Sequence, residues 1–347
     1  MTPSIRNVFT HHCTCPLVSL IYFSRPTEIS KYVVLAQRSV KEIMSCNMNR
    51  CAVIFLTVAA FLVFAGAAVF FYFGQYADES ILDFYIYNRT LQIFEKYPVE
   101  ITPAEWTFWT WTAVFGWQFL WLLYALILMC RQHGPKVLTP FFFVFNLLAF
   151  GFTLAWVMMW GEDLVNYALG FIAGTAASLL VALATVYYRF NILRFAMNRF
   201  PTGDQIAMEV LVINGIGLYA SWALFNAFQQ TAIVLKYTAE VEDDIACTIV
   251  LAGLASTILF WFCLDNFVFW EFTLYTVTPY APMIVGFTGT FMEFWDKNKR
   301  NSIFNVALLG STSFLLLLKV VHIIWRSRRD SKKSRRHVLV EEEKFEL

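Results

Sequence analysis

The residues with the clearest chemical potential are amides and tryptophans inside long apolar segments. Trp222, Asn226 and Gln230 are four residues apart, so on a helix they share one face. An amide surrounded by lipid must find a hydrogen-bond partner, so this face should point into a helix bundle. Two interpretations follow: the amides join helix to helix, or the amides and tryptophans line a pocket for a flat or rigid apolar ligand.

The sequence motifs of common enzymes are missing. There is no glycine-rich phosphate loop, no His-Glu-x-x-His and no Gly-x-Ser-x-Gly. His11, His12, Cys13 and Cys15 crowd together, but no second ligand pair follows at zinc-site spacing. Ionisable residues are rare in the apolar segments, and Lys319 is expected to snorkel to the membrane surface. The sequence therefore predicts no catalytic residue, no metal and no cofactor, in a protein that is not an enzyme.

The elements that must position these residues are membrane-spanning helices. Of 347 residues, 59% are hydrophobic, 18% aromatic and 15% charged; a soluble domain has about 25% charged residues. About 20 apolar helical residues cross a hydrocarbon core of about 30 Å. The fold class predicted is all-α, a polytopic integral membrane helical bundle of about eight transmembrane helices. The predicted helices cover residues 51–77, 106–130, 138–160, 164–188, 207–237, 245–264, 271–294 and 302–325.

Composition divides the chain into four regions. Residues 1–50 form a basic leader that is expected to be disordered, and residues 51–237 hold the first five helices. Residues 245–325 add three helices, and residues 326–347 form a tail that is first basic and then acidic.

The sixth and seventh predicted helices are separated by polar residues. Asp265, Asn266 and Glu271 interrupt an apolar stretch that is too long for one span, so they are expected at a turn in water. Pro279 and Pro282 predict a kink in the seventh helix.

The charge of the connections alternates along the chain. Lys and Arg are retained on the cytoplasmic side, so the basic connections at 131–136 and 189–199 are predicted to be cytoplasmic. The acidic connections at 78–105, 162–163 and 240–244 then lie on the opposite side. This alternation places both termini in the cytoplasm.

Three further features bear on this orientation. Residues 326–336 hold seven Lys or Arg, which agrees with a cytoplasmic end and predicts contact with anionic lipid. The loop 78–105 contains an Asn-Arg-Thr sequon, so Asn88 is a predicted glycosylation site if this loop faces a secretory lumen. The basic residues at 297–300 disagree, because they fall on the predicted non-cytoplasmic side.

Two tryptophan-containing segments carry a family resemblance. Residues 103–112, PAEWTFWTWT, are followed by Gln118, Trp121 and Tyr124, and the fifth helix has Ala-Ser-Trp at 220–222. These segments resemble the second and last helices of the TspO or translocator-protein family of tryptophan-rich membrane proteins. The resemblance covers residues 51–237 and implies a five-helix bundle. Two departures stand out: Trp-Thr replaces the family's Pro-Pro pair after Trp-Thr-Phe, and the last three helices lie outside the five-helix pattern.

Through this resemblance a ligand and a site can be expected. Family members are associated with porphyrins and sterols, which implies that the protein binds or transports such a ligand in a tryptophan-rich pocket. The residues that this resemblance places near the pocket are Trp106, Trp109, Trp121, Asn146, Trp222 and Gln230. A sterol-type pattern of Leu183, Tyr187 and Arg189 also occurs in the fourth helix.

Other classes of membrane protein stay open on the sequence alone. A receptor-like protein or a transporter of another class, or a structural membrane protein without a ligand, fits the helix count. Membrane lipid is the expected partner in every case, nucleic acid is not, and a homodimer is compatible with each interpretation.

Overall fold

Helices make up nearly all of the described part of the chain. The computed structural model describes residues 51–71, 90–131, 137–196, 202–268 and 273–345. Within these ranges there is no β strand, and seven helices are long and apolar enough to span a membrane. The prediction of an all-α, polytopic membrane bundle is confirmed. The leader 1–50 and the predicted glycosylation site Asn88 lie outside the described residues.

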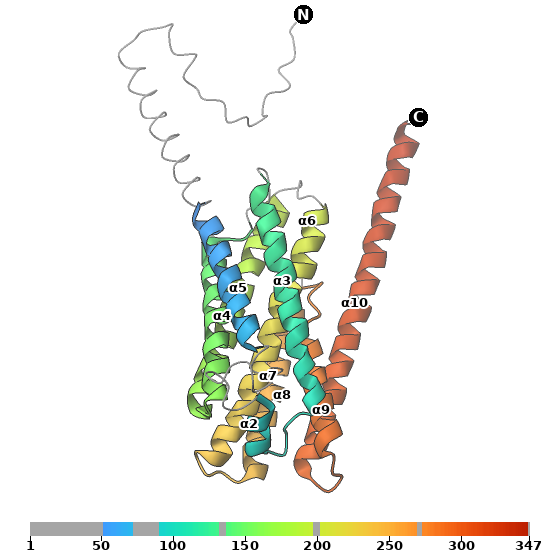
Figure 1. Ribbon diagram of the computed structural model, residues 1–347. Helices are drawn as coiled ribbons and strands as arrows, with labels where there is room; N and C mark the ends of the chain where they lie inside the picture. The colour runs from blue at the N-terminus through green and yellow to red at the C-terminus, as the bar shows by residue number, and fades with distance from the viewer. Residues whose placement is uncertain (1–50, 72–89, 132–136, 197–201, 269–272, 346–347) are drawn as a thin grey trace, which may run out of the picture. The chain divides into compact units, whose positions relative to one another are not determined.

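Figure 1 shows the order and arrangement of the helices. The first long helix is Cys51–Phe71. The labelled elements are α2 (Thr90–Lys96), η1 (Glu105–Phe108), α3 (Trp109–Cys130), α4 (Pro140–Gly161), α5 (Val165–Ala196), α6 (Thr202–Ala207), η2 (Met208–Ile213), α7 (Asn214–Tyr237), α8 (Asp243–Cys263), η3 (Leu264–Val268), α9 (Tyr280–Phe294) and α10 (Arg300–Phe345). η1 is a 3-10 turn, whereas η2 and η3 are π-helical.

Local sequence explains where several helices begin. The Thr139 side chain accepts a hydrogen bond from the backbone N–H of Phe142, and Pro140 occupies the first position of α4. Both are favourable at a helix N-terminus, where the first N–H groups lack partners inside the helix. Asp243 and Asp244 lie in the first turn of α8, where negative charge interacts favourably with the helix dipole.

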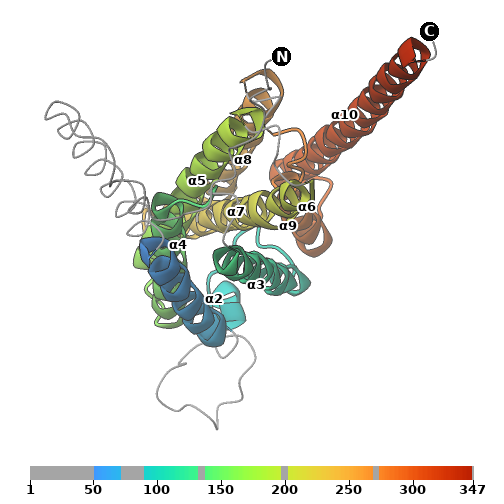
Figure 2. The ribbon, with the colours of Figure 1, turned by 90° about the horizontal axis from the view of Figure 1, so that it is seen from above.

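The central helix of the bundle is α7. It packs against α3, α5, α8 and α9, and Figure 2 shows it between α5 on one side and α3 on the other. Every residue from Asn214 to Ala223 is buried, as expected for a helix surrounded by other helices. At Gly286 of α9, an added Cβ would lie 2.3 Å from the Phe225 ring, so α9 approaches α7 this closely only because it has a glycine there.

The chain between α8 and α10 returns through the bundle. Arg300, at the start of α10, pairs with Asp244 at the start of α8, so these two helices begin at the same end. Near the end of α9, Thr290 donates a hydrogen bond to the carbonyl of Ile101 in the segment before η1.

The seventh predicted helix is shorter than expected. Helix α9 begins at Tyr280 and has 15 residues, about 22 Å, which is less than a hydrocarbon core of about 30 Å. The predicted start near residue 271 is wrong, because residues 273–279 form a bend, turns and irregular backbone before the helix begins at Tyr280. The fifth predicted helix is likewise not uniform, since its first turns are the π-helical η2.

A candidate ligand cavity and its polar end

A cavity of about 780 Å³ lies between α5, α7, α8 and α9. Its walls are largely apolar and include Leu183, Leu224, Ile258 and Met283. The floor is contributed by small residues of α7, among them Gly217 and Ala220. Gly217 also affects packing, because a Cβ added there would lie 3.1 Å from the Thr278 hydroxyl. Since glycine has no Cβ, the segment before α9 can approach α7 closely.

The cavity has a mouth on the lipid-facing side of the bundle. Leu180 and Tyr188 of α5 and Phe260 of α8 line it and are 44%, 68% and 65% exposed. Both α5 and α8 pack on α7, so the opening lies between α5 and α8, with α7 behind it. An apolar molecule in the bilayer could reach the cavity through this gap without crossing an aqueous loop.

One end of the cavity is closed by a buried ion pair. Lys319 Nζ of α10 lies 2.6 Å from Asp265 Oδ1 of η3, and the two side chains are 3% and 0% exposed. The Tyr280 hydroxyl donates to Asp265 Oδ2 at 3.2 Å, and the Thr273 hydroxyl donates to the Asp265 carbonyl at 3.1 Å.

This pair contradicts two expectations from the sequence. Asp265 does not lie at a turn in water, and Lys319 does not snorkel to the surface. The π-helical turns of η3 direct Asp265 toward α10, and a charged side chain in an apolar bundle is far less costly with an opposite charge beside it.

Asn214 holds the segment before α9 against the central helix. Its amide Nδ2 donates to the carbonyls of Glu209 and Tyr275 at 2.7 and 2.9 Å. Its Oδ1 accepts hydrogen bonds from the backbone N–H groups of Val277 and Thr278 at 3.0 and 3.3 Å. The amide therefore satisfies backbone groups that the non-helical segment leaves without partners, which makes such a segment tolerable inside a membrane bundle.

The π-helical η2, just before Asn214, is fixed by α3. The Trp117 indole donates to the Val210 carbonyl at 3.1 Å, and Gln118 Nε2 donates to the Gly215 carbonyl at 2.9 Å. Trp121 in turn donates to Gln118 Oε1 at 2.5 Å. π-helical turns recur at functional sites. Here Asn214 directly follows η2 and Asp265 lies within η3, and these two residues organise the polar end of the cavity.

A model of the TSPO-like protein family matches residues 57–320. The chain belongs to this family. The match runs beyond residues 51–237, where the sequence motifs lie, and includes α8, α9 and most of the apolar part of α10. No curated protein and no solved structure matches the chain significantly. Family membership and the seven apolar helices make this TSPO-like chain an integral, multi-pass membrane protein.

The six pocket residues expected from the resemblance fall into two groups. Trp106 in η1 is 42% exposed, and Trp109 at the start of α3 is 62% exposed. The other four are buried: Trp121, Asn146, Trp222 and Gln230. Asn146 donates to the Phe142 carbonyl one turn earlier in α4. None of the six lines the cavity described above, and a ligand-binding role for them stays a prediction.

Three buried tryptophans of this TSPO-like chain, Trp111, Trp156 and Trp222, form a cluster centred on Trp111. The Trp111 ring stacks on Trp156 with centroids 5.0 Å apart and meets the edge of Trp222 at 6.3 Å. The indole N–H groups of these three residues are buried and have no acceptor among the described residues. Sequence spacing relates Trp222 to Asn226, but it cannot reveal a cluster built from three different helices.

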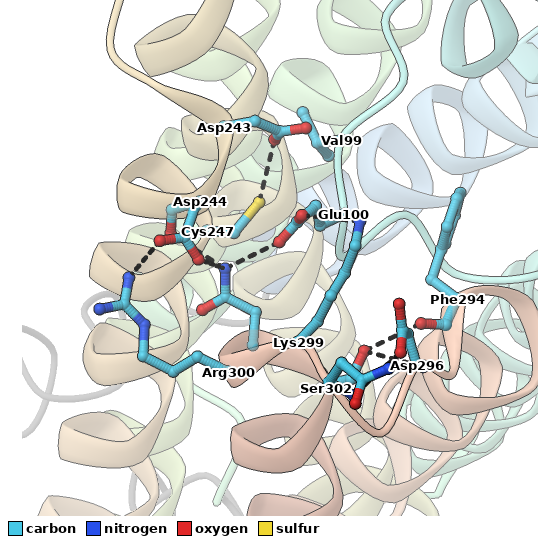
Figure 3. Close-up of polar contacts among 12 residues, drawn as sticks. Val99, Glu100, Asp243, Asp244, Cys247, Phe294, Asp296, Lys299, Arg300 and Ser302 are labelled. Atoms are coloured by element: carbon cyan, nitrogen blue, oxygen red, sulfur yellow. Dashed lines mark hydrogen bonds and ion pairs between the residues drawn. The ribbon is translucent and has the colours of Figure 1, made fainter.

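A second polar group lies where α8 and α10 begin, and we call it the Asn301 network (Figure 3). Its members are Glu100, Asp244, Thr248, Lys299, Arg300 and Asn301. Lys299 lies 2.9 Å from Glu100, which raises the pKa of the lysine, and Arg300 lies 2.6 Å from Asp244. Glu100 and Asp244, which lie at this same end, therefore pair with Lys299 and Arg300. These are two of the basic residues at 297–300 that disagreed with the predicted orientation.

Proposed function

We propose that the protein binds one rigid, apolar molecule of sterol size in the cavity between α5, α7, α8 and α9. The observation that carries this proposal is an apolar space of about 780 Å³ whose exposed mouth residues lie on lipid-facing helices. Ligand sites have volumes of about 300 to 1,000 Å³ and apolar walls with a few polar groups. Both conditions are met here.

Among the two ligand classes that the family resemblance suggests, a sterol fits this cavity better than a porphyrin. A porphyrin carries carboxylates, which need basic partners when they leave water. Asp265 is the one charged residue among those that line the cavity. Leu183 and Tyr187, two residues of the sterol-type pattern, also line it.

The proposed role is binding or transfer and not catalysis. Asp265 is paired with Lys319, so its charge is neutralised and is not available as a free base. Nor do the described residues contain a group of three or more His, Cys, Asp or Glu side chains that could hold a metal.

Binding of cholesterol to the purified full-length protein in nanodiscs tests the proposal. Ala184 of α5 lines the cavity, and Ala184→Trp should fill it and weaken saturable binding at least tenfold. Ala252 of α8 is exposed and does not line the cavity, so Ala252→Trp serves as the matched control and should bind like wild type. Equal binding by wild type and Ala184→Trp, with both folded, would contradict the proposal.

The tryptophan cluster around Trp111 is a second candidate for the ligand site. Three buried indole N–H groups that find no acceptor in the described part of the chain favour it, because a ligand oxygen could satisfy them. Trp222→Ala should weaken binding of a planar ligand by about 1 to 3 kcal/mol if this cluster is the site. Loss of melting temperature with unchanged affinity would assign Trp222 to the core.

We also propose that both termini are cytoplasmic and that the tail contacts anionic lipid. Helix α10 continues to Phe345, well beyond its apolar run, which ends at Trp325. The seven basic residues at 326–336 therefore follow the membrane-spanning part directly, where each is worth about 1 kcal/mol near an anionic surface.

A further inference from the structure

Five of the six hydroxyl groups that line the cavity give their proton to the protein, namely those of Tyr187, Ser221, Thr257, Thr273 and Tyr280. Tyr280 donates to Asp265 Oδ2 at 3.2 Å. Ser221 donates to the Pro279 carbonyl at 2.5 Å, and Thr257 donates to the Gly253 carbonyl at 2.9 Å. A hydroxyl has one proton and two lone pairs. Once the proton is used, the hydroxyl can only accept a further hydrogen bond.

The ion pair at the end of the cavity makes the Tyr280 hydroxyl oxygen a stronger hydrogen-bond acceptor. The carboxylate of Asp265 carries a negative charge and is held by Lys319 at 2.6 Å. A hydroxyl that donates to a carboxylate becomes a better acceptor, because hydrogen bonds in a chain polarise one another. The Tyr280 oxygen is thus prepared for a donor that arrives from the cavity.

The lining also contains one N–H group that lacks an acceptor within the described ranges. It is the indole N–H of Trp261, a residue of α8. The buried polar groups of the described cavity wall are therefore mostly acceptors, and the Trp261 indole is the buried side-chain donor left to spare. This arrangement suits a ligand group that can donate and accept, which a hydroxyl does and a ketone or an ester does not.

We infer that the ligand of this cavity carries a free hydroxyl, and that the cavity selects an alcohol over the corresponding ketone or ester. The inference rests on the proposed function and adds the chemical class of the ligand. The ligand hydroxyl donates to Tyr280 or Ser221, while its apolar body fills the space between α5 and α8. A ketone of the same shape fills the same space but leaves these oxygens without a donor.

A pair of matched probes tests this selectivity. The saturated sterols 5α-cholestan-3β-ol and 5α-cholestan-3-one have nearly the same shape and differ only in the hydroxyl or ketone at C3. The wild-type protein in nanodiscs should bind the alcohol about tenfold more tightly than the ketone, the effect of about one net hydrogen bond. Tyr280→Phe should remove this preference by weakening only the alcohol. Tyr219, which is buried and bonded to Thr153 but does not line the cavity, provides the control: Tyr219→Phe should keep the preference.

The outcomes separate the inference from the proposed function. Equal or tighter binding of the ketone by wild type overturns the inference, while sensitivity of both probes to Ala184→Trp would still support the cavity as the site. Binding of neither probe, or binding that Ala184→Trp leaves unchanged, overturns the proposed function itself. If Tyr280→Phe does not fold, or keeps the preference for the alcohol, then Ser221→Ala must remove this preference. A preference that survives in every folded variant contradicts the assignment of Tyr280 or Ser221 as the acceptor.

Discussion

The Asp265–Lys319 pair and the Arg300–Asp244 pair have the same length, 2.6 Å, but very different surroundings. The first is at most 3% exposed and closes a cavity, whereas the second is 53 to 60% exposed and belongs to the Asn301 network. Water and salt screen an exposed pair, so it contributes little to stability. In a buried pair, each charge depends on its partner, and losing one partner is costly. Similar ion-pair geometry therefore predicts different consequences at the two places.

The largest effect is expected from Lys319→Met. It leaves Asp265 charged and unpaired inside the bundle, which should lower the free energy of unfolding by about 3 to 5 kcal/mol. Thermal unfolding of the purified protein in detergent measures the loss. The double variant Asp265→Asn with Lys319→Met removes both charges and should recover most of the stability. A single variant that is as stable as wild type would show that the pair is not buried from water.

An intermediate effect is expected from Asn301→Ala. Asn301 is 1% exposed, and its amide donates to Glu100 and Asp244 while accepting from the Thr248 hydroxyl. Removing the amide leaves these groups less well paired, which should cost about 1 to 3 kcal/mol.

The matched control for Asn301→Ala is Asn298→Ala, at an exposed position three residues earlier. Thermal unfolding of both variants under one condition gives the comparison. If the two variants lose the same stability, the Asn301 network behaves as an ordinary exposed surface and the contrast with the Asp265–Lys319 pair becomes sharper.

The smallest effect is expected from Lys299→Gln, at about 1 kcal/mol or less. Glu100 raises the pKa of Lys299 above its ordinary value of 10.5. A raised lysine pKa stabilises the fold fully below the unfolded value, and this contribution is lost as the pH rises through the folded value. The difference between wild type and Lys299→Gln should therefore be constant from pH 7 to about pH 9.5, and should shrink above pH 10.5.

Salt provides the second test of this exposed pair. High salt should reduce the Lys299→Gln difference, because the Debye length falls from about 10 Å at 0.1 M to about 3 Å at 1 M. The Lys319→Met difference should change little under the same conditions. Equal salt sensitivity of the two variants would contradict the contrast between them.

The sequence by itself determined the class of the protein and most of its helices. Apolar length is a local property, so residues 106–130 and 138–160 predict α3 and α4 almost to their ends. The tryptophan motif at 103–112 was also sufficient to suggest the family that the match over residues 57–320 shows. The start of the seventh helix is an exception with a non-local cause: this helix begins at Tyr280 because the preceding segment is held by Asn214, a residue more than sixty positions earlier.

Only the tertiary structure decided where the ionisable residues and the cavity lie. Asp265 and Lys319 are 54 positions apart, and nothing in the spacing of either one identifies the other. The cavity is built from α5, α7, α8 and α9, so its lining is scattered from Leu180 to Met283. Hydropathy ranks each residue by the free energy of transferring its isolated side chain from water into lipid. On that scale a charged residue is expected to stay in water. In the folded bundle, an opposite charge and a tyrosine hydroxyl take the place of water around Asp265, a contribution that depends on distances between helices and is absent from any single segment.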